Sequence, residues 1–423
     1  MDRRHFFNQS AASLLLGSFA PATFLTSCHS EKKTHPMNRH FPAGAPRAIT
    51  MWDFSWLERR WDGAGYEDWD QALDELTERG YNAIRLDVYP HLIAENPEKK
   101  WLLKEQWNQQ VWESPDLIEV QIQPYLNEFL SKCRDRDIKV GLSSWFREDI
   151  ENVRMKLHTP EKLAECWMKT IQYIEKGGLL DTVLYVDLCN EFPGDAWALY
   201  FAAAYPEVGW GRWFAPDAME WMKKSLQPLQ VAYPDIPFIY SFDTEDVSVY
   251  EQVDASFLDF YEHHIWMAQQ NRGEYYKLVG YDYGRFSPEG YKNVVKNAER
   301  VYKEQPEYWQ GLLTKRIRQM GDVARKQGRP LVTTECWEIV DYKDWPMLKW
   351  DWVKELCALG TITAAETGMW AAISTSNFCG PQFVGMWRDI EWHRQLTSVI
   401  RSSSLDPSIT QNNEIAGKLL KRL

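Results

Sequence analysis

The stretch TVLYVDLCNEFPG, residues 182–194, decides the fold because it joins an apolar run to an Asn-Glu pair. The run TVLYV is rich in β-branched and aromatic side chains, which is typical of a strand buried on both faces. Asn, Pro and Gly are ordinary turn formers, so the residues after the run could simply form a turn. In a barrel of alternating strands and helices, however, the end of a strand is where catalytic residues lie.

The rest of the chain repeats this pattern of apolar runs and amphipathic segments. Strands are predicted at 47–52, 81–89, 138–145, 181–190, 236–243, 256–266, 330–337 and 368–375. Helices are predicted at 66–80, 115–137, 159–178, 215–233, 306–328, 347–360 and 392–403. Apolar strands that alternate with helices indicate a parallel sheet covered on both faces. Eight such strands favour a closed barrel over an open sheet, so we predict an α/β fold consisting of a single (β/α)8 TIM barrel.

Three segments are too long to be bare connections, namely 90–114, 195–214 and 267–306. Each follows the carboxyl end of a predicted strand and is rich in aromatic residues. Long loops in compact domains are usually functional or disordered, and aromatic-rich loops are seldom disordered. We therefore expect these segments to form the walls of a cleft on the active face of the barrel.

The amino-terminal residues 1–28 are predicted to be an export signal and not part of the fold. Arg3 and Arg4 resemble a twin-arginine signal, and the apolar stretch 11–25 follows them. LTSC, residues 25–28, resembles a bacterial lipobox and would make Cys28 the lipidated first residue of the mature chain. An ordinary cleaved signal peptide is the alternative. We expect residues 29–46 to be a linker, residues 47–423 to form the barrel, and the protein to be exported to the periplasm or cell envelope.

The composition limits the classes of partner. A net charge of −12 argues against binding to nucleic acid or directly to an anionic membrane, so membrane contact is expected only through the lipid anchor. The chain holds 22 Trp, 20 Tyr and 18 Phe, and flat aromatic rings suit the apolar faces of sugars. Neither a nucleotide-binding glycine motif nor a Cys/His spacing typical of zinc is present, so we expect no metal and no organic cofactor.

Two glutamates, Glu191 and Glu335, each follow an apolar strand although they are 144 residues apart in the sequence. Parallel strands of a barrel bring their carboxyl ends to one face. A pair of carboxyl groups flanking one bond is what glycosidic cleavage requires, because one donates a proton and the other attacks or activates water. Asp87, at the end of the second strand, could contact a sugar or pair with Arg85.

Four motifs in their order resemble the retaining glycoside hydrolases of clan A, especially the cellulase-like family 5 type among exported bacterial proteins. They are GYNAIRLDVYP (80–90), LCNEF (188–192), EHHIW (262–266) and TTECW (333–337). The resemblance implies that Glu191 is the general acid/base and Glu335 the nucleophile. It further implies that Arg85 supports the nucleophile, that Asn190 holds the sugar 2-hydroxyl, and that His264 belongs to the site, although His263 is possible.

These roles imply particular protonation states. Glu191 has to hold a proton near neutral pH, so its surroundings should raise its pKa. Glu335 has to be ionised, and we expect Arg85 to keep it so.

The chain departs from the family pattern at three strand ends. Ser144 and Trp145 stand where a His is common, and Trp266 stands where a Tyr is typical. The Trp usual at the end of strand eight is missing, since Trp370 lies at the start of that strand. Trp145, Trp266 and Trp337 could each be a platform for a bound sugar or a core residue.

The sequence therefore predicts a retaining β-glycoside hydrolase that acts on an oligo- or polysaccharide with two glutamates. Two alternatives stay open. One is a non-catalytic carbohydrate-binding lipoprotein on the same fold, and the other is an inverting glycosidase. The separation of the two carboxyl groups distinguishes retention from inversion. Neither the sugar nor the oligomeric state follows from the sequence.

Overall fold

The computed structural model describes residues 44–106, 114, 116–282, 287–340, 342, 347–411 and 414–423. The predicted export signal, Cys28 and most of the predicted linker lie outside these residues, so those predictions stay predictions.

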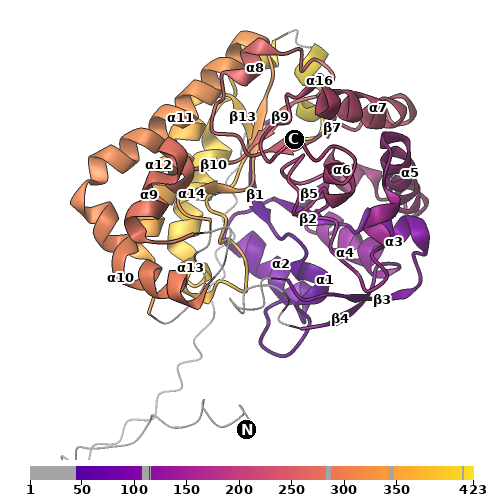
Figure 1. The fold of residues 1–423 in the computed structure, drawn as a ribbon, viewed down its shortest axis with the longest axis horizontal. Helices are drawn as coiled ribbons and strands as arrows, with labels where there is room; N and C mark the ends of the chain where they lie inside the picture. Colours follow the sequence, from indigo (N-terminus) through magenta and orange to yellow (C-terminus); the bar gives the residue numbers. More distant parts are fainter. Residues whose placement is uncertain are drawn as a thin grey trace, which may run out of the picture. The chain divides into compact units, whose positions relative to one another are not determined.

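Parallel strands at the centre of the described chain form a barrel with helices around it (Figure 1). Its strands are β1 (Arg47–Met51), β2 (Ala83–Asp87), β5 (Lys139–Ser143), β6 (Val183–Asp187), β7 (Phe238–Ile239), β8 (Ser241–Phe242), β9 (Tyr261–His263), β11 (Leu331–Thr333) and β13 (Trp370–Ile373). Their order is β7-β6-β5-β2-β1-β13-β11-β9-β8, and every pairing between them is parallel. Only Tyr240 separates β7 from β8, so the two edges of the sheet are halves of one strand and the barrel is nearly closed. The predicted (β/α)8 fold is confirmed.

The long helices lie outside the strands and follow them in the chain (Figure 1). They are α2 (Trp69–Glu78), α4 (Tyr125–Arg134), α5 (Pro160–Lys176), α7 (Pro216–Ala232), α10 (Pro288–Glu304), α11 (Pro306–Gln327), α12 (Asp351–Thr367) and α14 (Ile390–Ser402). Thr159 caps α5, because its hydroxyl accepts a hydrogen bond from the backbone N–H of Lys162. Gly80, after α2, has a φ of 87°, a conformation that glycine adopts without strain.

Shorter elements fill the connections. The helices are α1 (Ser55–Glu58), α3 (Pro90–Glu95), α6 (Leu199–Ala202), α8 (Val249–Gln252), α9 (Gln270–Val279), α13 (Val384–Trp387), α15 (Pro407–Thr410) and α16 (Glu414–Leu420). The strands are β3 (Lys100–Leu103), β4 (Ile118–Gln121), β10 (Ile265–Trp266) and β12 (Cys336–Trp337), and three 3-10 turns cover Val153–Lys156, Leu180–Thr182 and Met267–Gln269.

The predicted helix at 115–137 is wrong in its first half. Residues Ile118–Gln121 form β4, which pairs antiparallel with β3, and α4 begins only at Tyr125. Val120 lies opposite Trp101 and both are buried, so the local period is two and not 3.6. Pro124 then precedes the first helical residue, as suits a residue that has no N–H to donate.

The barrel interior is filled by apolar side chains from its strands, among them Ile49, Leu184 and Val332. Leu419 of α16 joins this interior cluster, and Arg422 donates to the carbonyl oxygens of Leu180 and Val183 at the start of β6. The carboxyl-terminal helix therefore closes the end of the barrel where the strands begin. The opposite end, where the strands finish, carries the polar residues described below.

Two further findings concern the described part of the chain. None of its helices is long and apolar enough to cross a membrane. Its six cysteines are all free and buried.

Candidate active site

Arg85 on β2 is the centre of a buried polar network at the carboxyl end of the barrel. Its Nη1 lies 3.1 Å from Glu335 Oε1, and its Nη2 lies 2.6 Å from both Asp187 Oδ2 and Asn190 Oδ1. The ring of Trp145 lies 4.6 Å from the guanidinium carbon. Because the guanidinium is planar and is held from several strands, it fixes the position of every partner it contacts.

Glu191, which follows β6 in the chain, has a strained backbone conformation. Its φ is 45°, which is unfavourable for a residue with a Cβ. The Ser241 hydroxyl accepts from the Glu191 N–H at 3.1 Å, and the Glu191 carbonyl accepts from Gly194 N–H at 2.7 Å. Such strain persists where the surroundings impose it, and it is frequent at functional sites.

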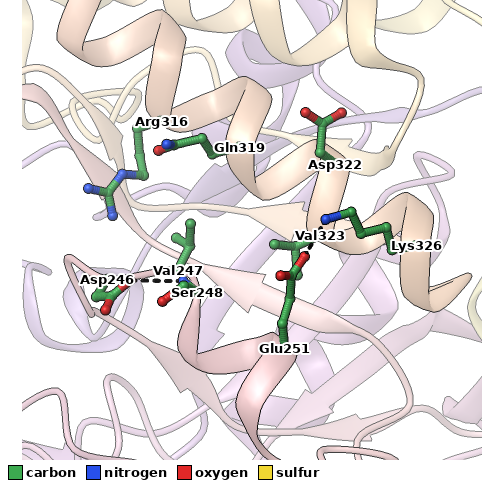
Figure 2. Close-up of a pocket in the computed structure, with 9 residues that line it drawn as sticks. All are labelled: Asp246, Val247, Ser248, Glu251, Arg316, Gln319, Asp322, Val323 and Lys326. Atoms are coloured by element: carbon green, nitrogen blue, oxygen red, sulfur yellow. Dashed lines mark hydrogen bonds and ion pairs between the residues drawn. The ribbon is translucent and has the colours of Figure 1, made fainter.

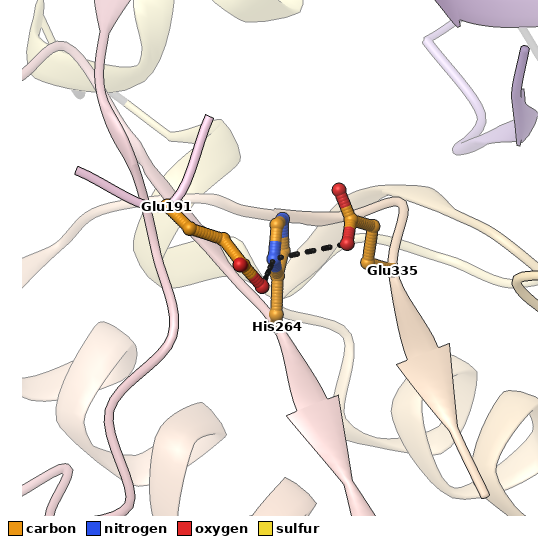
Figure 3. Close-up of side chains that lie close together, drawn as sticks. All are labelled: Glu191, His264 and Glu335. Atoms are coloured by element: carbon orange, nitrogen blue, oxygen red, sulfur yellow. Dashed lines mark hydrogen bonds and ion pairs between the residues drawn. The ribbon is translucent and has the colours of Figure 1, made fainter. Parts of the chain in front are cut away.

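His264 lies between the two glutamates predicted to be catalytic (Figure 3). Its Nδ1 is 2.9 Å from Glu191 Oε1 and 3.7 Å from Glu335 Oε2. One atom from each of the three side chains lies within 4.8 Å of the others. The fold therefore brings together two carboxyl groups that are far apart in the sequence.

Asn190 has an unused donor beside this pair. Its Oδ1 accepts from Arg85, which turns the amide nitrogen the other way. That nitrogen is buried and has no hydrogen-bond partner among the described residues. A buried donor without a partner is costly, and a ligand hydroxyl would satisfy it.

Burial raises the pKa of Glu335 to about 7, while the positive charges of His264 and Arg85 act against that rise. Arg85 pairs with this carboxyl group and lowers its pKa, in the direction expected, but burial outweighs the effect, so Glu335 is only partly ionised near neutral pH in the free site. His264 behaves in the opposite sense, because Glu335, Glu191 and Glu262 outweigh its burial and raise its pKa to about 10. Near neutral pH the histidine is a cation between two acids.

The structure also shows the surroundings of the other predicted site residues, His263 and Asp87. His264 is the histidine of the site, since His263 Nδ1 instead lies 3.1 Å from the hydroxyl of Tyr250. Asp87 neither pairs with Arg85 nor stands free for a sugar, because its carboxylate accepts from the backbone N–H groups of Tyr89 and Trp145.

The three tryptophans proposed as platforms or core residues are buried, with at most 2% of their surface exposed. Trp337 packs against α12, where a Cβ added at Gly360 would lie 2.6 Å from its ring, and its indole donates to Ser374. It is a core residue. Trp145 lies against Arg85 and Phe54. The indole nitrogen of Trp266 is buried and lacks a partner among the described residues.

Sequence reasoning missed three acidic residues of the site. Asp187 and Glu262 are fully buried and lie 2.6 Å and 3.6 Å from Arg85. Asp243 follows β8, and burial together with the charge of Glu191 raises its pKa to about 8. Glu262 opens the motif EHHIW and Asp187 directly precedes LCNEF, so their positions at strand ends were the available signal.

The spacing of Glu191, His264 and Glu335 would also suit a metal ion. A metal would have to displace the proton that His264 holds, because the neighbouring glutamates raise the pKa of its imidazole to about 10. The arrangement suits proton transfer and nucleophilic attack better than metal binding.

Comparison with known proteins agrees with this geometry. Residues 49–401 match the model of a family described as "Cellulase-like: Sugar-binding cellulase-like". A candidate glycoside hydrolase from Parabacteroides distasonis ATCC 8503, known from its crystal structure, is 72% identical. The match covers 90% of this chain and 100% of that one, with a TM-score of 0.89.

A more distant structure is an endocellulase from Pyrococcus horikoshii in complex with cellotetraose. It is 12% identical, the match covers 82% of this chain and 92% of that one, and the TM-score is 0.50. At this identity the likeness concerns the fold alone. The curated proteins contain no match. The family match over most of the barrel, together with the 72% identical glycoside hydrolase structure, places this chain in the cellulase-like family of glycoside hydrolases.

Proposed function

We propose that this glycoside hydrolase cleaves β-glycosidic bonds of an oligo- or polysaccharide with retention of configuration, using Glu191 as general acid/base and Glu335 as nucleophile. The observation that carries the proposal is the short distance between the two carboxyl groups, with oxygens within 4.8 Å of each other. Retaining enzymes place these groups about 5–5.5 Å apart, whereas inverting enzymes need about 6.5–9.5 Å to admit a water molecule. The spacing supports direct attack.

In the first step, a Glu335 oxygen attacks the anomeric carbon while Glu191 gives its proton to the departing glycosidic oxygen. The products are a glycosyl ester on Glu335 and a free sugar hydroxyl. In the second step, Glu191 takes a proton from water, the hydroxide oxygen bonds to the anomeric carbon, and the Glu335 ester bond breaks. Because the ester carries no charge, the first step removes a negative charge near Glu191 and favours its change from acid to base.

Asn190, Arg85 and His264 orient the reacting groups and the substrate. The amide nitrogen of Asn190, which has no partner in the free site, is available to donate to the 2-hydroxyl of the reacting sugar. Arg85 donates to both Glu335 and Asn190 and so fixes the position of one relative to the other. His264 donates from Nδ1 to Glu191 and so fixes the orientation of that carboxyl group.

Proton NMR of the first product tests the mechanism. We expect the β-anomer to appear first and to convert slowly to the equilibrium mixture, whereas initial α-anomer would establish inversion. Glu335→Gln should lose at least 10⁴-fold in kcat, because the nucleophile is gone. Glu191→Ala should regain turnover with added azide and yield a β-glycosyl azide. If wild-type protein binds sugars without cleaving any, the non-catalytic alternative is correct.

The substrate class is tested by a screen of aryl β-glycosides and polysaccharides with residues 29–423. The family description supports starting with β-linked glucans. The changes at strands three, six and eight alter the surroundings of the reacting sugar, so β-mannans and mixed-linkage glucans belong in the same screen.

We further propose that the enzyme is exported and anchored in the cell envelope by a lipid on Cys28. The Arg3-Arg4 pair, the apolar stretch and LTSC support this proposal. Full-length protein expressed in a bacterium should incorporate labelled palmitate and fractionate with membranes, whereas Cys28→Ser should do neither. Release of both proteins as soluble, unlabelled chains would instead indicate an ordinary signal peptide.

A further inference from the structure

A pocket of about 490 Å³ lies at the carboxyl end of the barrel, and Asp243, which is close enough to Glu191 to feel its charge, is part of its wall. It is formed by the segments that follow β6, β8 and β10, and its lining includes Trp210, Arg212, Asp243, Gln269 and Arg272. Two of these segments belong to the long insertions that the sequence singled out. The pocket lies on the side of strands four to six, whereas the nucleophile Glu335 follows strand seven.

Trp210 lines this pocket and also contacts the backbone close to Glu191, the proposed acid/base. A Cβ built on Gly194 would lie 3.1 Å from two ring carbons of Trp210, so the ring lies on the backbone three residues after Glu191. The side chain is nevertheless 43% exposed, and no other described ring packs against it. Most large aromatic side chains of this protein are buried, so an exposed indole at the pocket wall is a surface available to a ligand.

Polar groups line the same pocket. A Cβ built on Gly211, whose φ is 72°, would lie 2.9 Å from the carbonyl oxygen of Asp243, which shows how closely the Trp210 loop packs on the Asp243 backbone. With its amide nitrogen turned toward Asp243, Gln269 donates to both carboxyl oxygens at 3.0 and 3.3 Å. Among the described residues, no carboxylate pairs with the guanidinium of Arg212 or Arg272. The pocket therefore combines an apolar ring with free donors, the two features that a sugar requires.

A neighbouring pocket of about 330 Å³ lacks this combination (Figure 2). Val247 and Val323 are its apolar residues, no aromatic ring lines it, and Lys326 is already paired with Glu251 at 2.7 Å. The two pockets share Asp246. Of these two pockets, we regard that of Trp210 as the stronger candidate because it has an exposed aromatic ring that packs on the backbone close to Glu191.

We propose that the pocket of Trp210, Arg212, Asp243, Gln269 and Arg272 binds the leaving-group sugar of an oligosaccharide, with the sugar ring stacked on Trp210. This inference rests on the proposed function. Since Glu191 protonates the oxygen that departs, the sugar attached to that oxygen lies on the Glu191 side of the cleaved bond. Occupation of this pocket makes an extended saccharide the preferred substrate and a free saccharide a good acceptor in the second step.

Two substrates that share one reacting sugar test the inference. Cellopentaose should fill the pocket with its leaving-group sugar, whereas cellobiosyl β-fluoride leaves the pocket empty because its leaving group is fluoride. If the enzyme prefers mannose, mannopentaose and mannobiosyl β-fluoride take the place of these two substrates. In Trp210→Ala we expect kcat/KM for the pentasaccharide to fall about tenfold, as loss of one stacking contact implies, and kcat/KM for the fluoride to change less than about twofold. Equal losses on both substrates, or none on the pentasaccharide, would overturn the inference.

Controls separate this inference from the proposed function. Tyr125→Ala removes an aromatic side chain of similar exposure, 40%, that does not line the pocket, and it should leave both values unchanged. Glu335→Gln should abolish turnover of both substrates. If wild-type protein cleaves neither, the proposed function fails, and titration of tryptophan fluorescence with the pentasaccharide still tests the pocket. Trp210→Ala should then bind about tenfold more weakly, and unchanged affinity would refute the pocket.

Discussion

At the scale of single residues, the carboxyl group of Glu335 experiences two opposing influences. Burial disfavours its charge, and the cations His264 and Arg85 favour it, with the outcome that its pKa is raised to about 7. A nucleophile with this pKa is only partly ionised at neutral pH. A sugar that binds and displaces water therefore acts on a carboxyl group whose pKa lies close to neutral pH.

The raised pKa predicts a pH dependence. Because the nucleophile must be ionised, kcat/KM should fall about tenfold per unit as pH decreases below about 7. The pH profile of kcat/KM checks this, with circular dichroism at each pH to show that the protein stays folded. Asp243, with a pKa raised to about 8, titrates nearby, so Asp243→Asn should keep the acid limb if Glu335 causes it. A flat profile down to pH 5 would contradict the prediction.

At the residue scale, sequence reasoning identified the catalytic candidates but not their electrostatics. Glu191, Glu335, Arg85 and His264 stand at strand ends, where the barrel pattern is sufficient to place them near one another. Whether a carboxyl group is buried, and which charges face it, depends on residues such as Asp187 and Glu262 that reach the network from other strands. Such contacts arise from three-dimensional packing.

At the scale of single elements, two glycines on neighbouring helices have opposite roles. Gly360 lies within α12 against β12, and a Cβ there would lie 2.6 Å from the ring of Trp337. Gly311 lies within α11, and a Cβ there would meet nothing within 4 Å. The first glycine is needed for close packing of a helix on the barrel, whereas the second only lowers helix propensity.

This contrast predicts opposite effects of the same substitution. Gly360→Ala should lower the free energy of unfolding by about 1–3 kcal/mol, because overpacking exceeds the gain in helix propensity. Gly311→Ala should raise it by about 0.5–1 kcal/mol, because alanine restricts the unfolded chain and favours the helix. Denaturant titrations of both variants provide the measurement, and a stabilised Gly360→Ala would show that Trp337 is free to move.

The hairpin of β3 and β4 illustrates why one element was predicted incorrectly. Apolar residues at 118, 120, 122 and 126 fit both a strand followed by a helix and one long helix. Pairing of β4 with β3, which lies across a gap of 14 residues, selects the strand. The local pattern fits both structures, and the partner strand decided between them.

At the scale of the whole molecule, the barrel has one closed end and one functional end. α16 closes the end where the strands begin, through Leu419 and Arg422. The catalytic pair and the pocket of Trp210 lie at the other end. Residues important for stability and residues proposed for catalysis therefore lie at opposite ends of the same barrel.

This separation predicts that Leu419→Ala affects stability and not catalysis. Leu419 is 1% exposed, so its truncation should cost about 2–5 kcal/mol of unfolding free energy. The folded fraction should keep its kcat and KM, because no residue of the active face moves. Thermal unfolding and steady-state kinetics of the same preparation check both parts, and a changed KM would mean that α16 is coupled to the active face.

The sequence by itself determined the alternation of eight apolar strands with helices, the barrel, and the strand ends at which the reactive residues stand. These features follow from local periodicity, which each segment carries independently of the others. Only the tertiary structure decided that Trp337 packs against α12, that His264 and not His263 lies between the glutamates, and that Glu335 has a raised pKa. Each of these depends on which atoms from distant segments share a buried volume, and that follows from the closure of the barrel and not from any single stretch of chain.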